Sequence, residues 1–228
     1  MSSKANLNFK IAITGIFSAL AVIFTVTPIG YITIGVVGLT IVHIPVILAA
    51  ILGGPVAGIC TGFIFGLTSL IKAGVVPQGL NPLFFNPLIS VFPRVLFPLA
   101  VYGIFKLFDL IPKMPKFISA SIAAAAGTFV HTFLVILMLV VVHSEEVLVA
   151  FGLDPANGII SGFWKVLGLA FLSNGIYEIV AATVVTFIVM SSIYISKKKS
   201  SKISMLDLSS KDDSADTDAA DTQVTDVE

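Results

Sequence analysis

Long apolar segments alternate along the chain with short breaks that are rich in glycine, proline or lysine. Most of these segments approach or exceed the roughly 20 residues that a helix needs to cross a bilayer. The pattern predicts an all-α integral membrane protein, built as a bundle of six transmembrane helices. The predicted spans cover residues 11–26, 32–52, 56–71, 87–108, 117–142 and 162–195.

The start of the second span is the least defined boundary. Its apolar run, residues 40–52, is short for a span, so the predicted helix begins earlier, near Ile32. Residues 27–39 are nevertheless rich in Gly, Thr and Ile, which favours a short extended loop. After the third span, residues 72–85 contain several loop-forming residues and predict an irregular connection.

The composition agrees with a membrane protein and divides the chain in two. Of 228 residues, 57% are apolar by type and 11% are charged, whereas soluble domains have roughly a quarter of charged residues. Half of the charged residues lie between Lys197 and Glu228. We therefore expect a membrane domain over residues 1–196 and a basic, then acidic, disordered cytoplasmic tail over residues 197–228.

The lysines indicate how the bundle is oriented. Six spans place both termini on one side, and most lysines fall at the span ends on that side. The positive-inside rule therefore predicts cytoplasmic termini in a multi-pass protein of the cell membrane. The lysines on that side are Lys4, Lys10, Lys106, Lys113, Lys116 and Lys197 to Lys199, and the opposite side carries Lys72, Lys165, Glu145, Glu146 and Asp154.

Several function classes are excluded by what the sequence lacks. One cysteine, Cys60, and 3 histidines supply neither a thiolate cluster nor a structural zinc site. A formal net charge of zero argues against a nucleic-acid partner. The chain has no P-loop for ATP hydrolysis and no His-Glu-x-x-His motif. We expect neither an enzyme nor a protein with a resident metal or cofactor.

Small residues form stripes on two of the predicted helices. In lipid, helices gain no hydrophobic free energy by associating, and small residues let two backbones approach closely. The stripe in and before the third span indicates packing within the chain, whereas the stripe on the first span fits either packing or a docking face for another membrane protein. The stripes are Gly54, Gly58, Gly62 and Gly66 for the third span and Ala12, Gly15 and Ala19 for the first.

Polar side chains occur at membrane depth in four of the predicted spans. A charged group there costs roughly 2.5 to 3.5 kcal/mol on insertion scales, so it persists when paired or beside a wet cavity. Three interpretations stay open: an ion pair between Arg94 and Glu178, a polar cavity that binds a solute, and a proton relay through His131 and Glu178. The polar residues are His43, Arg94, His131, Asn174, Tyr177 and Glu178.

The two histidines differ in their surroundings. His131 shares a helix face with small residues and is therefore expected in the bundle interior; these are Ser119, Ala123 and Gly127. His43, near the middle of the second span, fits a packing role as well as a ligand contact.

The loop after the third span supplies amides and aromatic rings. Gln78, Asn81 and Asn86 stand among prolines beside Phe84 and Phe85. Such a segment either caps a cavity and offers its amides to a small solute or simply connects two helices.

At several points the sequence resembles the substrate-specific (S) components of energy-coupling-factor (ECF) transporters. The stretch LTIVHIPVILAAILGGPVAG, from Leu39 to Gly58, is similar to their second helix and the turn after it. GFIFGLTSL, from Gly62 to Leu70, is similar to their third helix. Pro93 with Arg94, and the segment from Asn174 to Glu178, match the pattern in order and spacing, so that the resemblance covers about residues 9–199.

The resemblance implies a vitamin-binding membrane subunit that captures its substrate outside the cell. It also implies partners, namely a transmembrane scaffold (the T component) and two ATPase subunits, which agrees with the missing P-loop. Family members dock to the scaffold through small residues on the first helix. Ala12, Gly15 and Ala19 occupy that place, although the family's Ala-x-x-x-Ala pair is absent.

Within the family, His43 before Ile44 and Pro45, followed by a Gly-Pro pair, most resembles the pantothenate type. Helix five departs from the family pattern, because His131 and Thr132 stand where Asn-Thr is common. Pantothenate is a small anion with a carboxylate, an amide and two hydroxyls. Arg94, or alternatively Lys165, would hold the carboxylate by charge-assisted hydrogen bonds. The amide and hydroxyls would be served by Asn81, Asn86 and Asn174.

Other substrates and classes stay open. Riboflavin or folate would want an aromatic slot, which Trp164, Tyr177 and Phe85 would provide. A self-sufficient proton-coupled carrier would use His131 and Glu178. A membrane scaffold without a ligand would need Arg94 and Glu178 only as a structural pair.

Overall fold

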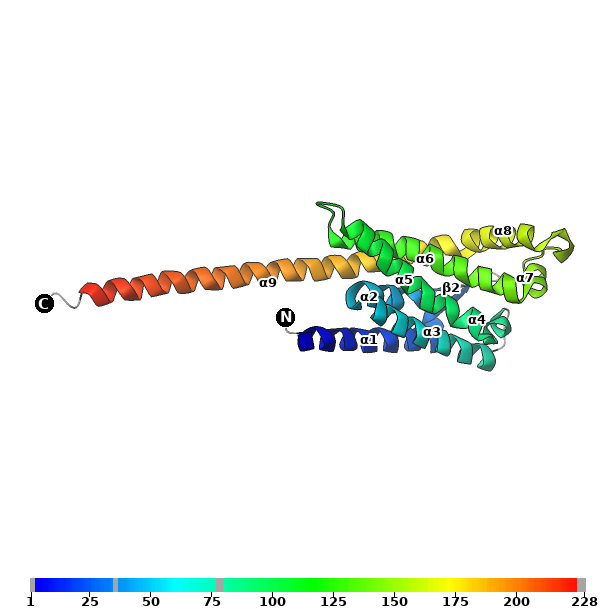
Figure 1. Ribbon diagram of the computed structural model, residues 1–228, viewed down its shortest axis with the longest axis horizontal. Coiled ribbons are helices and arrows are strands. Elements are labelled where there is room, and N and C mark those ends of the chain that lie inside the picture. The colour runs from blue at the N-terminus through cyan, green and yellow to red at the C-terminus, as the bar shows by residue number, and fades with distance from the viewer. Residues whose placement is uncertain (1–2, 35–36, 77–79, 225–228) are drawn as a thin grey trace. The chain divides into compact units, whose positions relative to one another are not determined.

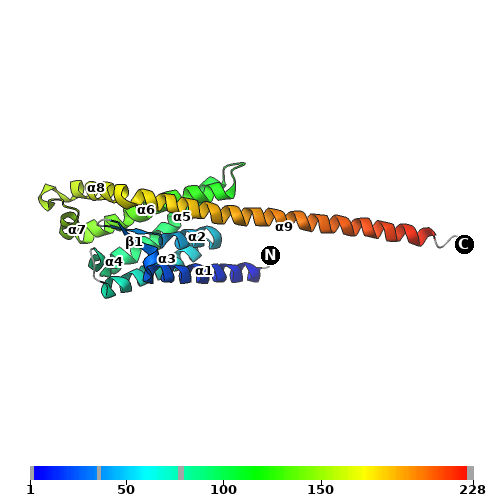
Figure 2. The ribbon, with the colours of Figure 1, turned by 180° about the vertical axis from the view of Figure 1, so that it is seen from behind.

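The computed structural model describes residues 3–34, 37–76 and 80–224 and divides the chain into two units, Met1–Phe187 and Ile188–Glu228. The first unit is a bundle of helices with one short hairpin (Figures 1 and 2). The described helices are α1 Ser3–Val26, α2 His43–Gly53, α3 Pro55–Val75, α4 Pro87–Ser90, α5 Phe92–Asp109, α6 Lys116–Val142, α7 Ser144–Ala150, α8 Ile159–Ala170 and α9 Ile176–Val224.

Five helical segments are long and apolar enough to cross a membrane, which confirms the prediction of a helical, multi-pass protein. They are Lys4–Val26, Pro55–Val75, Pro87–Asp109, Lys116–Val142 and Ile159–Ser200. The predicted second span corresponds to the shorter helix α2 of 11 residues. At a rise of 1.5 Å per residue α2 is about 16 Å long, roughly half of the hydrocarbon core. Six full crossings and cytoplasmic termini stay predictions.

The start of the second helix near Ile32 was wrong. Tyr31–Ile34 (β1) and Val37–Thr40 (β2) form an antiparallel hairpin, in which Tyr31 is opposite Thr40. The extended loop expected over this stretch is therefore confirmed, because its β-branched residues favour strands and its glycines disfavour a helix. The following helix α2 is buried along almost its whole length, from His43 to Ile51. It therefore lies in the interior of the bundle.

The predicted last span is interrupted by a wider turn. A π-helix, Phe171–Gly175, joins α8 to α9 and contains the buried residues Asn174 and Gly175. Such π-turns are frequent at functional sites because they redirect the side chains that follow. In the second unit the helix α9 continues through the predicted tail to Val224; the disorder of that tail in solution stays a prediction.

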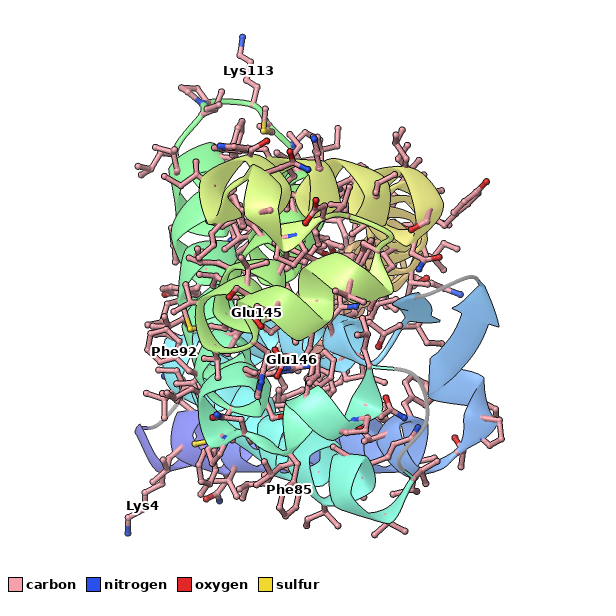
Figure 3. The ribbon with its side chains drawn as sticks, turned by 90° about the vertical axis from the view of Figure 1, so that its right-hand side faces the viewer. Lys4, Phe85, Phe92, Lys113, Glu145 and Glu146 are labelled. Carbon is pink, nitrogen blue, oxygen red and sulfur yellow. The ribbon has the colours of Figure 1, made fainter. Side chains whose placement is uncertain are left out.

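The two ends of the first unit differ in their charged residues. The start of α1 and the connection between α5 and α6 lie at one end (Figure 1) and carry Lys4, Lys10, Lys106, Lys113 and Lys116. The other end, seen in Figure 3, carries Glu145 and Glu146 on α7. This asymmetry is the one that the positive-inside rule requires if the α1 end is cytoplasmic.

Three glycines of the predicted stripe, Gly58, Gly62 and Gly66, pack closely within the chain as expected, whereas Gly54 has a φ of 90° after the end of α2 and meets open space. A methyl group on Gly58 would lie 2.9 Å from Pro98 Cβ, and one on Gly66 would lie 2.8 Å from Val91 Cα. At Gly62 a methyl group would overlap the carbonyl oxygen of Arg94. This carbonyl has no intrahelical donor at the next turn, because Pro98 lacks an N–H. The backbones of α3 and α5 therefore meet directly at Gly62.

We predict that Gly62→Ala destabilises the protein by about 1–3 kcal/mol, because the added methyl group overlaps the Arg94 carbonyl and forces the two helices apart. The measurement is the free energy of unfolding in detergent. Gly103→Ala on α5 is the matched control, since a methyl group there meets open space. Equal effects of the two substitutions would contradict the close backbone contact.

Candidate functional site

Two histidines lie against each other in the interior of the bundle. His43, from the start of α2, and His131, from the middle of α6, stack with ring centroids 5.5 Å apart and planes 13° apart. Both side chains are buried, and among the described residues none of their four ring nitrogens has a hydrogen-bond partner. Buried polar atoms of this kind are rare in native proteins, so that the histidine pair is a candidate functional site.

Aromatic rings surround this histidine pair. The edge of Phe97 meets His131 with centroids 4.8 Å apart, and Phe65 lies 6.2 Å from the same ring. Phe65 comes from α3, between Gly62 and Gly66 of the packing stripe, and Phe97 comes from α5. The histidines are thus held by rings from two neighbouring helices, in a setting that excludes lipid.

Arg94 is buried beside the same rings, with 5% of its surface exposed. Its guanidinium carbon lies 5.2 Å from the ring centres of Phe65 and Phe84, which is within the range of cation–π attraction. Its Nη1 also donates to the carbonyl oxygen of Ile89. That carbonyl accepts because Pro93, four residues later, has no N–H to offer it.

Glu178 is buried to the same extent and contacts the hairpin. Its Oε1 accepts a hydrogen bond of 2.6 Å from the backbone N–H of Thr40, the last residue of β2. The hydroxyl of Thr132 on α6 faces the same carboxyl. Asn174, one turn earlier, is buried in the π-helix, which packs against β2. The π-helix and the first turn of α9 therefore place two buried polar residues next to the hairpin.

The structural ion pair considered for the two buried charges does not form. Among the residues that the structure describes, no salt bridge joins Arg94 to Glu178; the carboxylate of Glu178 is bound by Thr40 instead. The described part of the chain also contains no group of three His, Cys, Asp or Glu side chains that would hold a metal ion.

The structure brings together part of the predicted site. His43, Arg94 and His131 form one cluster, and Asn174 and Glu178 lie at the hairpin. Tyr177 and Trp164 lie on the surface, with 59% and 61% of their area exposed, so that neither belongs to the buried cluster.

The loop asparagines serve the local backbone. Asn81 donates to the carbonyl oxygen of Val76, and the side chain of Asn86 caps α4 by accepting from Leu88 N–H. Gln78 lies outside the described residues. Both described asparagines therefore hold the shape of the loop that leads to Phe84.

Three contributors to the site were not named from the sequence, Thr40, Phe65 and Phe97, while Phe84 was named only as part of the loop and Thr132 only beside His131. Two of them had a readable signal. Phe65 stands three residues after Gly62 on the face that packs against α5, and Phe97 stands three residues after Arg94. The two threonines gave none, because their contacts depend on how the hairpin and α6 meet α9.

We predict that Glu178→Ala accelerates hydrogen exchange at the Thr40 amide about tenfold or more, because a buried N–H loses its acceptor. Glu178→Gln keeps an acceptor oxygen and should retain most of the protection. Exchange is followed by mass spectrometry on a peptide that includes Thr40. Glu145→Ala, at an exposed position on α7, is the control; unchanged exchange in Glu178→Ala would show that this bond does not hold the hairpin.

A protein-family model described as "ECF transporter, substrate-specific component" matches residues 9–190, which is most of the chain and all of the first unit except its beginning. A search of curated proteins found no match.

Proposed function

Because the chain belongs to the family of ECF transporter substrate-specific components, we propose that it binds pantothenate, a water-soluble vitamin, from outside the cell for ATP-driven uptake. The family makes the chain a transporter subunit and not an enzyme, in the cell membrane with several membrane passes. Components of this kind bind a substrate and associate with the ECF module. The vitamin and its binding residues are our proposal.

The observation that carries the proposal is a buried guanidinium next to unpartnered histidines. Arg94 would hold the carboxylate of the vitamin by charge-assisted bonds, which are about twice as strong as neutral ones. His43 and His131, whose ring nitrogens have no partner among the described residues, would bind its amide and hydroxyl groups. Asn174 and Glu178, at the hairpin, complete the proposed site.

The phenylalanine rings favour a second candidate. Phe65, Phe84 and Phe97 surround Arg94 and His131. A flat ring system, as in riboflavin or folate, would stack on such rings. Of the two, folate also has the carboxylates that Arg94 would require.

We further propose that the partners are a transmembrane T component and two ATPase subunits. The docking face would be the stripe of Ala12, Gly15 and Ala19 on α1, whose side chains are exposed, with open space around Gly15. Uptake would then depend on ATP and on these partners. Uptake by this chain alone, abolished by a protonophore, would indicate a proton-coupled carrier instead.

We predict that pantothenate raises the stability of the detergent-purified chain by about 2.7 kcal/mol at a hundred times its dissociation constant. The measurement is thermal unfolding across a panel of water-soluble vitamins, with protein truncated after Lys202. A shift with riboflavin or folate alone would show that this vitamin, and not pantothenate, is the substrate. No shift with any vitamin, from folded protein, would contradict vitamin capture by this subunit.

We predict that Arg94→Ala weakens pantothenate binding by about 10- to 100-fold, because a hydrogen-bonded charge contributes about 1.5–3 kcal/mol. Arg94→Lys should recover only part of the affinity, since an ammonium lacks the bidentate geometry. Binding is measured by isothermal titration calorimetry. Lys106→Ala on the same helix is the control; its ammonium lies over Tyr102, away from the cluster. Unchanged affinity in Arg94→Ala would refute this site.

A further inference from the structure

We infer that the site is built for a bipolar ligand, with a carboxylate at the Arg94 end and hydrogen-bond donors, such as hydroxyl groups, at the Glu178 end. The inference rests on the proposed function, because it assumes that this buried cluster is the substrate site. It adds the direction in which the substrate lies and the chemical class that the two ends select.

The first step is that two opposite charges are buried in one bundle without neutralising each other. Arg94 and Glu178 are each 5% exposed. The contacts of Glu178 are with Thr40 and Thr132, and those of Arg94 include Ile89, Phe65 and Phe84. In the described part of the chain the two charges are therefore contacted by different groups and not by each other.

The second step is that the histidine pair connects the two charges. Phe65 contacts both Arg94 and His131, so the guanidinium and the His131 ring share one aromatic neighbour. On the other side, Thr132 follows His131 directly and faces Glu178. The polar groups are therefore linked in the order guanidinium, imidazole rings, carboxyl group.

His43 repeats this connection from a second helix. It stacks on His131, and it stands three residues after Thr40, whose N–H binds Glu178. The histidine pair is thus linked to Glu178 twice: through Thr132, one residue after His131, and through Thr40, three residues before His43. The order of the polar groups does not depend on a single contact.

The third step is chemical. An ammonium beside Arg94 would meet a like charge in a medium where screening is weak. Donor groups suit the Glu178 end, since the oxygens of its carboxyl group accept hydrogen bonds and Oε1 already accepts one from Thr40. A neutral imidazole has one donor and one acceptor nitrogen and so matches a hydroxyl or an amide between the ends.

This order separates the candidate vitamins by class. A molecule with a carboxylate at one end and hydroxyls at the other, as in pantothenate, fits in one direction only. A carboxylate without opposite donors, as in nicotinate, would leave the Glu178 end unfilled. A cation without a carboxylate would meet Arg94. Sites built to hydrogen-bond a hydroxyl reject analogues that lack it far more strongly than apolar pockets reject a methyl group.

The experiment is a cross of ligands and variants in calorimetry. The ligands are pantothenate, its alcohol analogue with CH₂OH in place of the carboxylate, and its analogues lacking either hydroxyl. The proteins are the wild type, Arg94→Gln and Glu178→Gln, with Glu145→Gln as a matched control on α7. Glu178→Gln keeps an oxygen for the Thr40 N–H, and Thr132→Val tests the same end with Glu178 intact.

We expect the wild type and Glu145→Gln to prefer pantothenate to each analogue by about 10- to 100-fold. Arg94→Gln should lose the preference over the alcohol analogue and keep the preference over a deoxy analogue. Glu178→Gln and Thr132→Val should show the reverse. This crossed pattern supports the bipolar site.

Other patterns overturn the inference. If both variants lose both preferences equally, or if Glu178→Gln changes neither, the two ends are not selective. Binding of thiamine or riboflavin in place of any carboxylate vitamin would leave vitamin capture in place and reject the bipolar ligand. Absence of binding to every vitamin, from folded wild-type protein, would reject the proposed function as well.

Discussion

The direct contact between the backbones of α3 and α5 at Gly62 is the constraint on which the site depends. Two helices approach this closely only where neither has a side chain in the way, and in lipid that approach is itself a main source of attraction. The contact fixes Arg94 on α5 next to Phe65 on α3. The same segment of α5 contains Pro93 and Pro98, which have no N–H group. The carbonyl oxygen of Ile89 is therefore left for the Arg94 guanidinium, and the carbonyl oxygen of Arg94 is left facing Gly62.

The bundle concentrates its polar side chains where lipid cannot reach them. α2 is too short to cross the hydrocarbon core alone and is buried almost throughout, so that His43 starts a helix in the protein interior. The hairpin before it brings the N–H of Thr40 to Glu178, which would otherwise be a carboxylate without a partner in an apolar bundle. A short helix and an irregular segment at membrane depth are tolerated because the surrounding helices shield their polar groups.

Periodicity and composition predicted the features that depend on local sequence. The long spans, the glycine stripe, the interior position of His131 and the depth of Arg94 follow from apolar run length, small-residue spacing and the cost of buried charge. The residues of the hairpin correctly predicted extended structure. The length expected of a membrane span nevertheless placed the start of the predicted helix at Ile32, inside the hairpin. The partners of Glu178 were out of reach, because Thr40 and Glu178 are 138 residues apart in sequence. Tyr177 is exposed while Glu178 is buried, because neighbouring residues of a helix point in different directions.

The π-turn also explains how one helix serves two environments. An uninterrupted α-helix repeats its faces every 3.6 residues, whereas the extra residue of a π-turn shifts the following faces by roughly 100°. After this shift Glu178 is buried against Thr40, while its neighbour Tyr177 is exposed. The bond from Thr40 to Glu178 joins the segment before α2 to α9, and α2 begins with His43. The bond that attaches the hairpin to α9 therefore also holds the start of α2, the helix that carries one histidine of the pair.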